Sequence, residues 1–358
     1  MGEHTSPTES FEEVLEYGRT VLSTARDEYD ALERTETVPS GLVEAISDLE
    51  RELDELDQVL NVDDVDLDLA QQTVQRIELL EAVFSALRER QRTVVEGDVS
   101  RIEYHLAGLA TLIREYGGKD GIKEKLDSIE GKQQMLNTLI SKDRHEKIVT
   151  NDRVSTEKID TSIRQLEADI EPHVPDSLRV ETYTAITENL LDEIHDALAS
   201  LGNDNDDRTA YATELKSIKK QRSQIEDDDH GDGDAEMAQT MLEETLRLHR
   251  SIVRSQADQR VAERLADTVA EFGSTVECNV DRCVSSGDSD TLLRAITDAI
   301  GTDIQRSTVE RLQQLLEEHD GSVLRTAQAT DFDVPTILEH LEQLYDDGEI
   351  ADLEVSFN

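Results

Sequence analysis

The chain has 358 residues, and its 82 Asp and Glu residues outnumber 36 Lys and Arg residues, leaving a formal net charge of -46. Aromatic residues make up 3% and Pro occurs five times. This composition argues against an all-β sandwich, which uses aromatic and β-branched strands with frequent turn residues. Two cysteines argue against a disulfide-stabilised scaffold. No apolar run reaches the roughly 18 residues of a membrane helix, and the polar residues 1–8 lack the apolar core of a signal peptide.

The negative charge is not accompanied by the composition of a disordered chain, because 36% of the residues are hydrophobic and recur at helical spacing. Lysine occurs 10 times beside 26 arginines. This composition resembles that of cytoplasmic proteins from haloarchaea that accumulate salt, and the resemblance implies a cytoplasmic protein. An acidic scaffold from a low-salt organism is the alternative. At about 1 M salt the Debye length is roughly 3 Å, so departures from acidity carry more information than the acidity itself.

Apolar residues at alternating spacings of three and four predict heptad helices over most of the chain. The clearest seam precedes an acidic break at residues 61–68 and consists of Leu42, Ile46, Leu49, Leu53, Leu56 and Leu60. Further breaks are expected at Pro39, near Gly97 and at Gly117. The predicted fold class is mainly α, an elongated antiparallel helical bundle or coiled-coil body with a small C-terminal winged-helix-like domain.

Composition shifts divide the chain into five parts. We expect a flexible N-terminus (1–8), a helical coiled-coil body (9–226), an acidic linker (227–235), a long helical segment (236–302) and a C-terminal module (303–358). Within the fourth part, one helix is predicted from Glu236 to about Arg282. A short helix from Asp290 to Ile300 is predicted to follow it.

The C-terminal module begins with an amphipathic helix after Thr308. A short extended piece at Ser322–Val323, two further helices and an alternating strand at residues 352–357 are predicted next. The apolar and small residues that set this order are Leu324, Ala327, Val334, Ile337, Leu341, Leu344, Gly348 and Ile350. Their order resembles that of the winged helix-turn-helix family.

The resemblance implies that the third helix of the module lies in the major groove of DNA. The outward-facing candidates for contact with DNA or a partner are Thr336, His340 and Gln343, together with Arg325. Residues 308–358 contain thirteen acidic and two basic residues, whereas phosphate binding depends on Lys and Arg. A winged helix used for protein contact is therefore the other interpretation, and we favour it.

Lysine is concentrated in two places. Seven of the ten lysines lie between Lys119 and Lys158, where a projecting hairpin with a tip at Lys142, Arg144 and Lys147 is one interpretation. A second basic face at helical spacing comprises Lys216, Lys219, Lys220 and Arg222. Each group is a candidate contact patch for an acidic partner or nucleic acid. Ordinary pairing with glutamates on a solvated helix is the alternative, which we favour.

Signatures of catalysis are not found in the sequence. There is no phosphate-binding loop, dinucleotide-binding glycine motif, nucleophile elbow or His-Glu-x-x-His motif. Cys278 and Cys283 do not have zinc-site spacing and are expected to be free thiols. His105, next to a seam position, is interpreted as a helix-surface or boundary residue. We therefore expect no enzyme, no catalytic residue, no cofactor, no metal and no small-molecule substrate.

Two functions follow from these patterns. The first is a non-enzymatic scaffold or adaptor that associates with itself or another protein through its heptad seams and uses the winged-helix-like module for protein contact. The second is a DNA-binding transcriptional regulator or chromosome-associated protein, with the winged helix as the DNA reader. Neither function requires a membrane.

Overall fold

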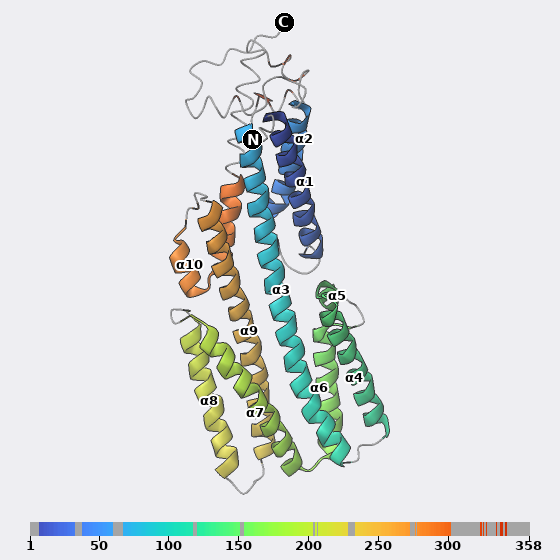
Figure 1. Ribbon diagram of the computed structural model, residues 1–358. Coiled ribbons are helices and arrows are strands. Elements are labelled where there is room, and N and C mark those ends of the chain that lie inside the picture. The colour runs from blue at the N-terminus through green and yellow to red at the C-terminus, as the bar shows by residue number, and fades with distance from the viewer. Residues whose placement is uncertain are drawn as a thin grey trace, which may run out of the picture.

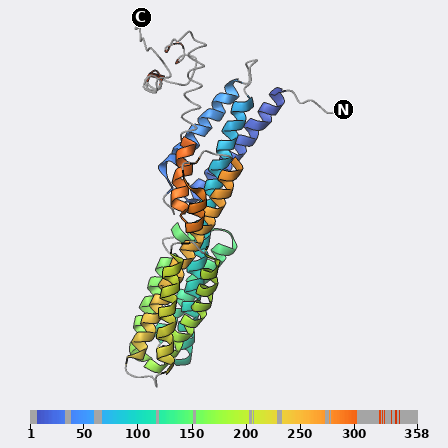
Figure 2. The same ribbon diagram turned by 90° about the vertical axis from the view of Figure 1, so that its left-hand side faces the viewer.

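The computed structural model describes residues 7–32, 38–59, 67–116, 120–150, 154–202, 205, 207–227, 233–272, 276, 278–301 and seven single positions between 323 and 341. These residues are mainly helical, and no strand occurs among them. The predicted mainly α class is therefore confirmed. The helices form an elongated bundle, as Figure 1 and Figure 2 show from two directions.

The helices are long and follow one another through short connections. In chain order they are α1 (Pro7–Leu32), α2 (Ser40–Val59), α3 (Leu67–Tyr116), α4 (Asp120–Ser141), α5 (Glu146–Thr150), α6 (Thr156–Ile170), the 3₁₀ turn η1 (Glu171–His173), α7 (Asp176–Ser200), α8 (Arg208–Asp227), α9 (Asp234–Phe272) and α10 (Val280–Ser286). Residues 289–301 are also helical.

Two antiparallel helices, α3 and α9, hold the bundle together along its length (Figure 1). With 50 residues, α3 is about 75 Å long, and the 39 residues of α9 span about 58 Å. The first half of α3 packs with α1, α2, α10 and the second half of α9. The second half of α3 packs with α4, α6, α7 and the first half of α9. The body therefore has two apolar cores that share α3 and α9.

The heptad seams lie inside these cores. Leu42, Leu49 and Leu53 of α2 are at most 1% exposed, and the α3 positions Ile77, Leu80 and Phe84 are fully buried. The predicted seam register is thus confirmed at every seam position of α2 whose burial the structure describes. Because these side chains pack against helices of the same chain, the seam is not a free surface for a second copy or another protein.

The predicted helix break near Gly97 is wrong. The helix α3 continues through this position, and a Cβ atom there would lie 2.5 Å from Cγ1 of Val253. Gly108 is similar, since its Cβ would lie 2.3 Å from Cγ1 of Ile186 on α7. Both glycines therefore allow close crossing of helices, and neither ends α3.

The helix predicted from Glu236 to Arg282 is divided in the structure. The helix α9 ends at Phe272, and α10 begins at Val280, where the side chain of Asn279 accepts a hydrogen bond from the backbone N–H of Arg282. This side-chain cap favours a new helix start over continuation of α9. The predicted short helix at Asp290–Ile300 is confirmed by the helical residues 289–301.

The remaining boundaries agree with the predicted linkers in part. The helix α1 begins at Pro7, within the N-terminal part expected to be flexible, and α8 and α9 extend to Asp227 and from Asp234 into the predicted acidic linker. Most of the C-terminal module lies outside the described residues, including the expected strand at 352–357. Val323, predicted to be extended, is helical, and Ile337 and Leu341 are helical and buried as expected.

Candidate functional site

The first basic group lies in the turn between α4 and α5 and does not project from the body. Residues 142–145 form this turn (Figure 1), which packs against the middle of α3: Asp143 pairs with Arg92, and Nε2 of the buried His145 lies 3.0 Å from Oε1 of Glu96. The hypothesis of a projecting tip is therefore wrong, because these polar contacts hold the turn against α3. Lys142, Arg144 and Lys147 remain exposed around it.

The second basic group lies on α8, at the outer edge of the half of the bundle that contains α4, α6 and α7 (Figure 1). The apolar side chains Leu215, Ile218 and Ile225 are buried and join the core of that half. Their spacing directs the opposite face of the helix to solvent. This exposed face consists of Thr209, Ala210, Thr213, Lys216, Ser217, Lys219, Lys220, Ser223 and Gln224.

Among the α8 residues whose burial the structure describes, the exposed face carries lysines and no carboxylate. Lys216, Lys219 and Lys220 are three and four residues apart, so their side chains emerge from one side of the helix. Within the described part of the chain, no carboxylate forms an ion pair with any of these three ammonium groups. Residues 208–225 contain five basic residues and one acidic residue, in contrast to the excess of carboxylates in the whole chain.

Glu214 of α8 and Glu188 of the neighbouring helix α7 are engaged in ion pairs. Glu214 of α8 pairs with Arg247 of α9. Oε1 of Glu188 on α7 lies 2.9 Å from Nη2 of Arg222, so Arg222 is partly neutralised. Pairing with glutamate, the alternative that we favoured from the sequence, thus holds for Arg222. For the three lysines, the described residues show no such pairing. We call the nine exposed residues of α8 between Thr209 and Gln224, listed above, the α8 basic face.

A buried charge network, which sequence reasoning missed, crosses the core between α3, α6, α7 and α9. The guanidinium of Arg101 donates to both carboxylate oxygens of Asp160 and to Asp98, at 3.3 Å from Oδ1 of Asp98. Asp98 also lies 3.4 Å from Nε of Arg250. Arg101 is 5% exposed, so the network is shielded from water. A polar stripe at heptad spacing within α3, consisting of Asp98, Arg101 and His105, was the signal that could have revealed it.

Two histidines extend this network. Nε2 of His105 lies 2.8 Å from Oε1 of Glu167, and Nε2 of His249 lies 3.1 Å from Oε2 of Glu193. Burial lowers the pKa of His249, and the Glu193 carboxylate opposes this shift. The interpretation of His105 as a surface or boundary residue is wrong, because its side chain points into the core and is 4% exposed.

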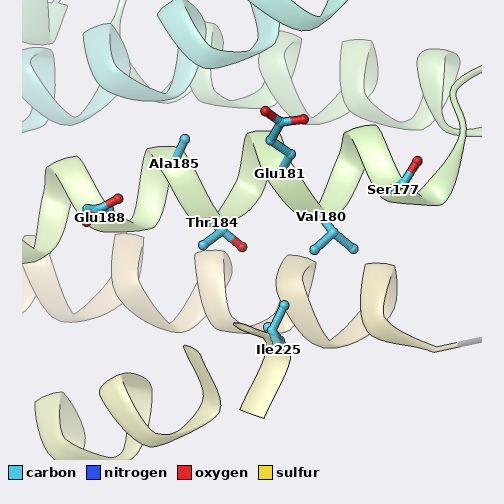
Figure 3. A pocket seen from close by; sticks show the side chains of 7 residues that line it. All are labelled: Ser177, Val180, Glu181, Thr184, Ala185, Glu188 and Ile225. Carbon is cyan, nitrogen blue, oxygen red and sulfur yellow. The ribbon is translucent and has the colours of Figure 1, made fainter. Parts of the chain in front are cut away.

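A pocket of about 430 Å³ lies between α7 and the end of α8. Figure 3 shows Val180 and Thr184 pointing toward Ile225, whereas Glu181 points away from it. Glu188 also lines the pocket and is engaged with Arg222. The pocket is an open groove, since most of its α7 residues are exposed. Its polar lining consists of the carboxylates Glu181 and Glu188 and the hydroxyl groups of Ser177 and Thr184.

Across the described ranges, no three His, Cys, Asp or Glu side chains are grouped so that they could hold a metal ion. None of the described helices contains a segment both long and apolar enough to span a bilayer. Cys278 and Cys283 are free thiols, as predicted, and Cys283 is buried.

The DNA-contact candidates of the C-terminal module are only partly described. Arg325 is helical and exposed, and Thr336, His340 and Gln343 lie outside the described residues. Comparison of the chain with protein-family models, with curated proteins and with solved structures finds no match. The α8 basic face is therefore the candidate site that the described contacts define best.

Proposed function

We propose that this protein is a non-enzymatic scaffold or adaptor that docks an anionic partner on the α8 basic face. The observation that carries the proposal is the set of three exposed ammonium groups of Lys216, Lys219 and Lys220 without an ion-paired carboxylate among the described residues. In a chain of charge -46, such a face is complementary to a negatively charged partner and differs from the rest of the surface.

The shape of the body supports a role in connecting two sites. The α8 basic face lies in one half of the bundle, and the helix at residues 289–301 lies in the other half, where Thr297 approaches Gly41 at the start of α2 (Figure 1). This helix leads into residues 303–358, which we propose as the protein-contact module of the adaptor. The winged-helix resemblance and the buried Ile337 and Leu341 support this part of the proposal.

Self-association through the heptad seams is not retained in this proposal, since the seam side chains pack within the chain. The second function, DNA binding by the third helix of the C-terminal module, has less support. Residues 308–358 contain only two basic residues and thirteen acidic ones, and phosphate binding depends on basic residues. An anionic partner is better matched by α8.

Heparin chromatography tests the proposal. The full chain is loaded at the lowest KCl concentration that maintains its helical circular dichroism signal and eluted with rising KCl. Retention of the wild-type chain and earlier elution of the triple variant Lys216→Gln, Lys219→Gln, Lys220→Gln are expected. The control is Lys142→Gln, Arg144→Gln, Lys147→Gln, which removes the same charge from the α4–α5 turn. Equal retention of the wild type and the α8 variant would refute the docking role of α8.

A further inference from the structure

The chemistry of the α8 basic face indicates which kind of anion it binds. Besides its three lysines it presents hydroxyl and amide groups on Thr209, Thr213, Ser217, Ser223 and Gln224, and the only apolar side chain on it is Ala210. Lysine, hydroxyl and amide side chains are the groups that proteins use to contact phosphate and sugar oxygens of nucleic acids. This combination therefore fits a phosphodiester backbone.

A protein partner is less well matched. Specific protein interfaces are centred on buried aromatic or large apolar side chains, which supply most of the binding energy. The large apolar side chains described as exposed are Tyr17, Met135, Val149 and Met237, and they belong to other helices. On α8 itself, Leu215 and Ile218 are buried in the core and unavailable to a partner. The face therefore lacks the apolar centre that an acidic protein surface would bury.

The geometry of α8 also suits a continuous polyanion. The helix has 20 residues and is about 30 Å long, and exposed hydroxyl groups lie on both sides of the lysines along it. Thr213 and Ser223 donate to backbone carbonyl groups of their own helix, and their oxygens can still accept or exchange hydrogen bonds at the surface. A partner running along residues 209–224 would thus meet charge in the middle and neutral polar groups on either side, and Glu226 and Asp227 follow at the end of the helix.

Charge repulsion from the rest of the chain limits the strength of binding and does not exclude it. At about 1 M salt, as in salt-accumulating cells, the Debye length is roughly 3 Å, so distant carboxylates act weakly on α8 and the attraction of its lysines for phosphate is screened as well. Among the nearby carboxylates, Glu188 and Glu214 are paired with arginines. Glu244 accepts a hydrogen bond from Nε2 of Gln221 at 3.1 Å. Glu226 and Asp227 end the same helix, so the positive segment of α8 is short and is bounded by acidic residues.

We infer that the α8 basic face binds the sugar–phosphate backbone of nucleic acid without reading the base sequence. This inference rests on the proposed function, because it specifies the anionic partner of the adaptor. Three lysine contacts release about three counterions, so the logarithm of the affinity should fall against the logarithm of the salt concentration with a slope of about -2.7. Contacts to the sugar–phosphate backbone carry no sequence information, so the inference predicts equal affinity for duplexes of different sequence.

The test uses the full chain and short fluorescent DNA duplexes of mixed sequence, with binding followed by fluorescence anisotropy in a KCl series. The series begins at the lowest KCl concentration that preserves the helical circular dichroism signal. The α8 triple variant is expected to bind at least about tenfold more weakly than the wild type and to lose most of the salt slope. The variant of Lys142, Arg144 and Lys147 is expected to bind like the wild type.

Four outcomes would overturn the inference, and the last of them is failure to bind either polyanion. The first is an equal loss of affinity in both triple variants, which would indicate a general charge effect. The second is a strong preference for one duplex sequence. The third is competition by polyglutamate that equals competition by unlabelled duplex at the same total charge. In that case the face binds acidic polypeptides and the adaptor function survives, whereas failure to bind either polyanion would refute both proposals.

Discussion

A Cβ atom on Gly97 of α3 would lie 2.5 Å from Cγ1 and 3.0 Å from Cγ2 of Val253 on α9. The two longest helices therefore cross at a point where the missing side chain of one residue makes room for the other. The crossing lies at the edge of the core that α3 shares with α4, α6 and α7, since Gly97 is flanked by Val95 and Val99 of that core, and Val253 follows its member Ile252.

Replacing Gly97 with Ala should destabilise the fold despite the higher helix propensity of Ala. The propensity gain is about 1 kcal/mol, and overpacking against Val253 costs about 1–3 kcal/mol. Because Val is stiff at χ1 and cannot easily move aside, we expect the free energy of unfolding to fall by up to about 2 kcal/mol in chemical denaturation. Gly131→Ala is the control, because nothing lies within 4 Å of a Cβ atom at that exposed position of α4, and it should stabilise the protein. Stabilisation by both substitutions would contradict the close crossing.

The seam of α2 predicts a second difference in stability. Leu53 is 1% exposed and packs in the core that contains α1 and α3. Leu53→Ala should therefore lower the free energy of unfolding by about 2–5 kcal/mol. Glu50 lies off the seam in a surface ion pair with Arg26. Glu50→Ala should change the free energy of unfolding by no more than about 0.5 kcal/mol. Equal shifts of the two thermal melts would show that the register is incorrect.

The buried network predicts a large effect of removing one cation. Arg101→Met leaves the carboxylates of Asp98 and Asp160 without their shared partner inside the core, which should cost about 3–5 kcal/mol. Arg247→Met removes an exposed guanidinium that pairs with Glu214, and its cost should stay below about 1 kcal/mol. Denaturant titrations of both variants provide the measurement, and a similar cost for the two would argue against a shielded network.

The lowered pKa of His249 predicts a dependence of stability on pH. In the unfolded chain the imidazole has its ordinary pKa of 6.5, whereas in the folded protein its pKa is lower. Below about pH 6.5 the unfolded state therefore binds more protons at this residue than the folded state does. Stability from this residue is thus complete above pH 6.5 and decreases on acidification. The groups facing the ring are Glu193, Arg101 and Asp98.

His249→Gln should remove this component. Thermal midpoints of the wild type and the variant are measured between about pH 5 and 7.5. Their difference separates the contribution of His249 from that of the many carboxylates. His195→Gln, an exposed position of α7, is the control for loss of a surface histidine. A flat difference for His249→Gln would mean that the buried imidazole does not contribute to the pH dependence.

The charge of the chain predicts a requirement for salt. At a net charge of -46, repulsion between carboxylates is poorly screened below about 0.5 M KCl, and the fold should loosen there. Circular dichroism during KCl titration measures this effect. Full cooperative helix in 50 mM salt, a concentration at which the Debye length exceeds about 10 Å, would contradict the resemblance to proteins of salt-accumulating cells.

The sequence alone determined the helical class, most helix positions and the residues that face the cores. The spacing of Leu42, Leu49 and Leu53 is a local property, and burial of an apolar stripe follows from it wherever the helix packs. The tightly spaced lysines of α8 were also visible in the sequence.

Only the tertiary structure decided what these patterns do. Gly97 is a helix breaker in the sequence and a crossing point in the structure, because its role depends on Val253, which is remote in the chain. In the same way, the packing of α7, α8 and α9 pairs Arg222 with Glu188 while Lys216, Lys219 and Lys220 keep no ion pair among the described carboxylates. Local spacing selects the face of a helix that is exposed, whereas the charges that meet on that face are selected by residues brought together from distant parts of the chain.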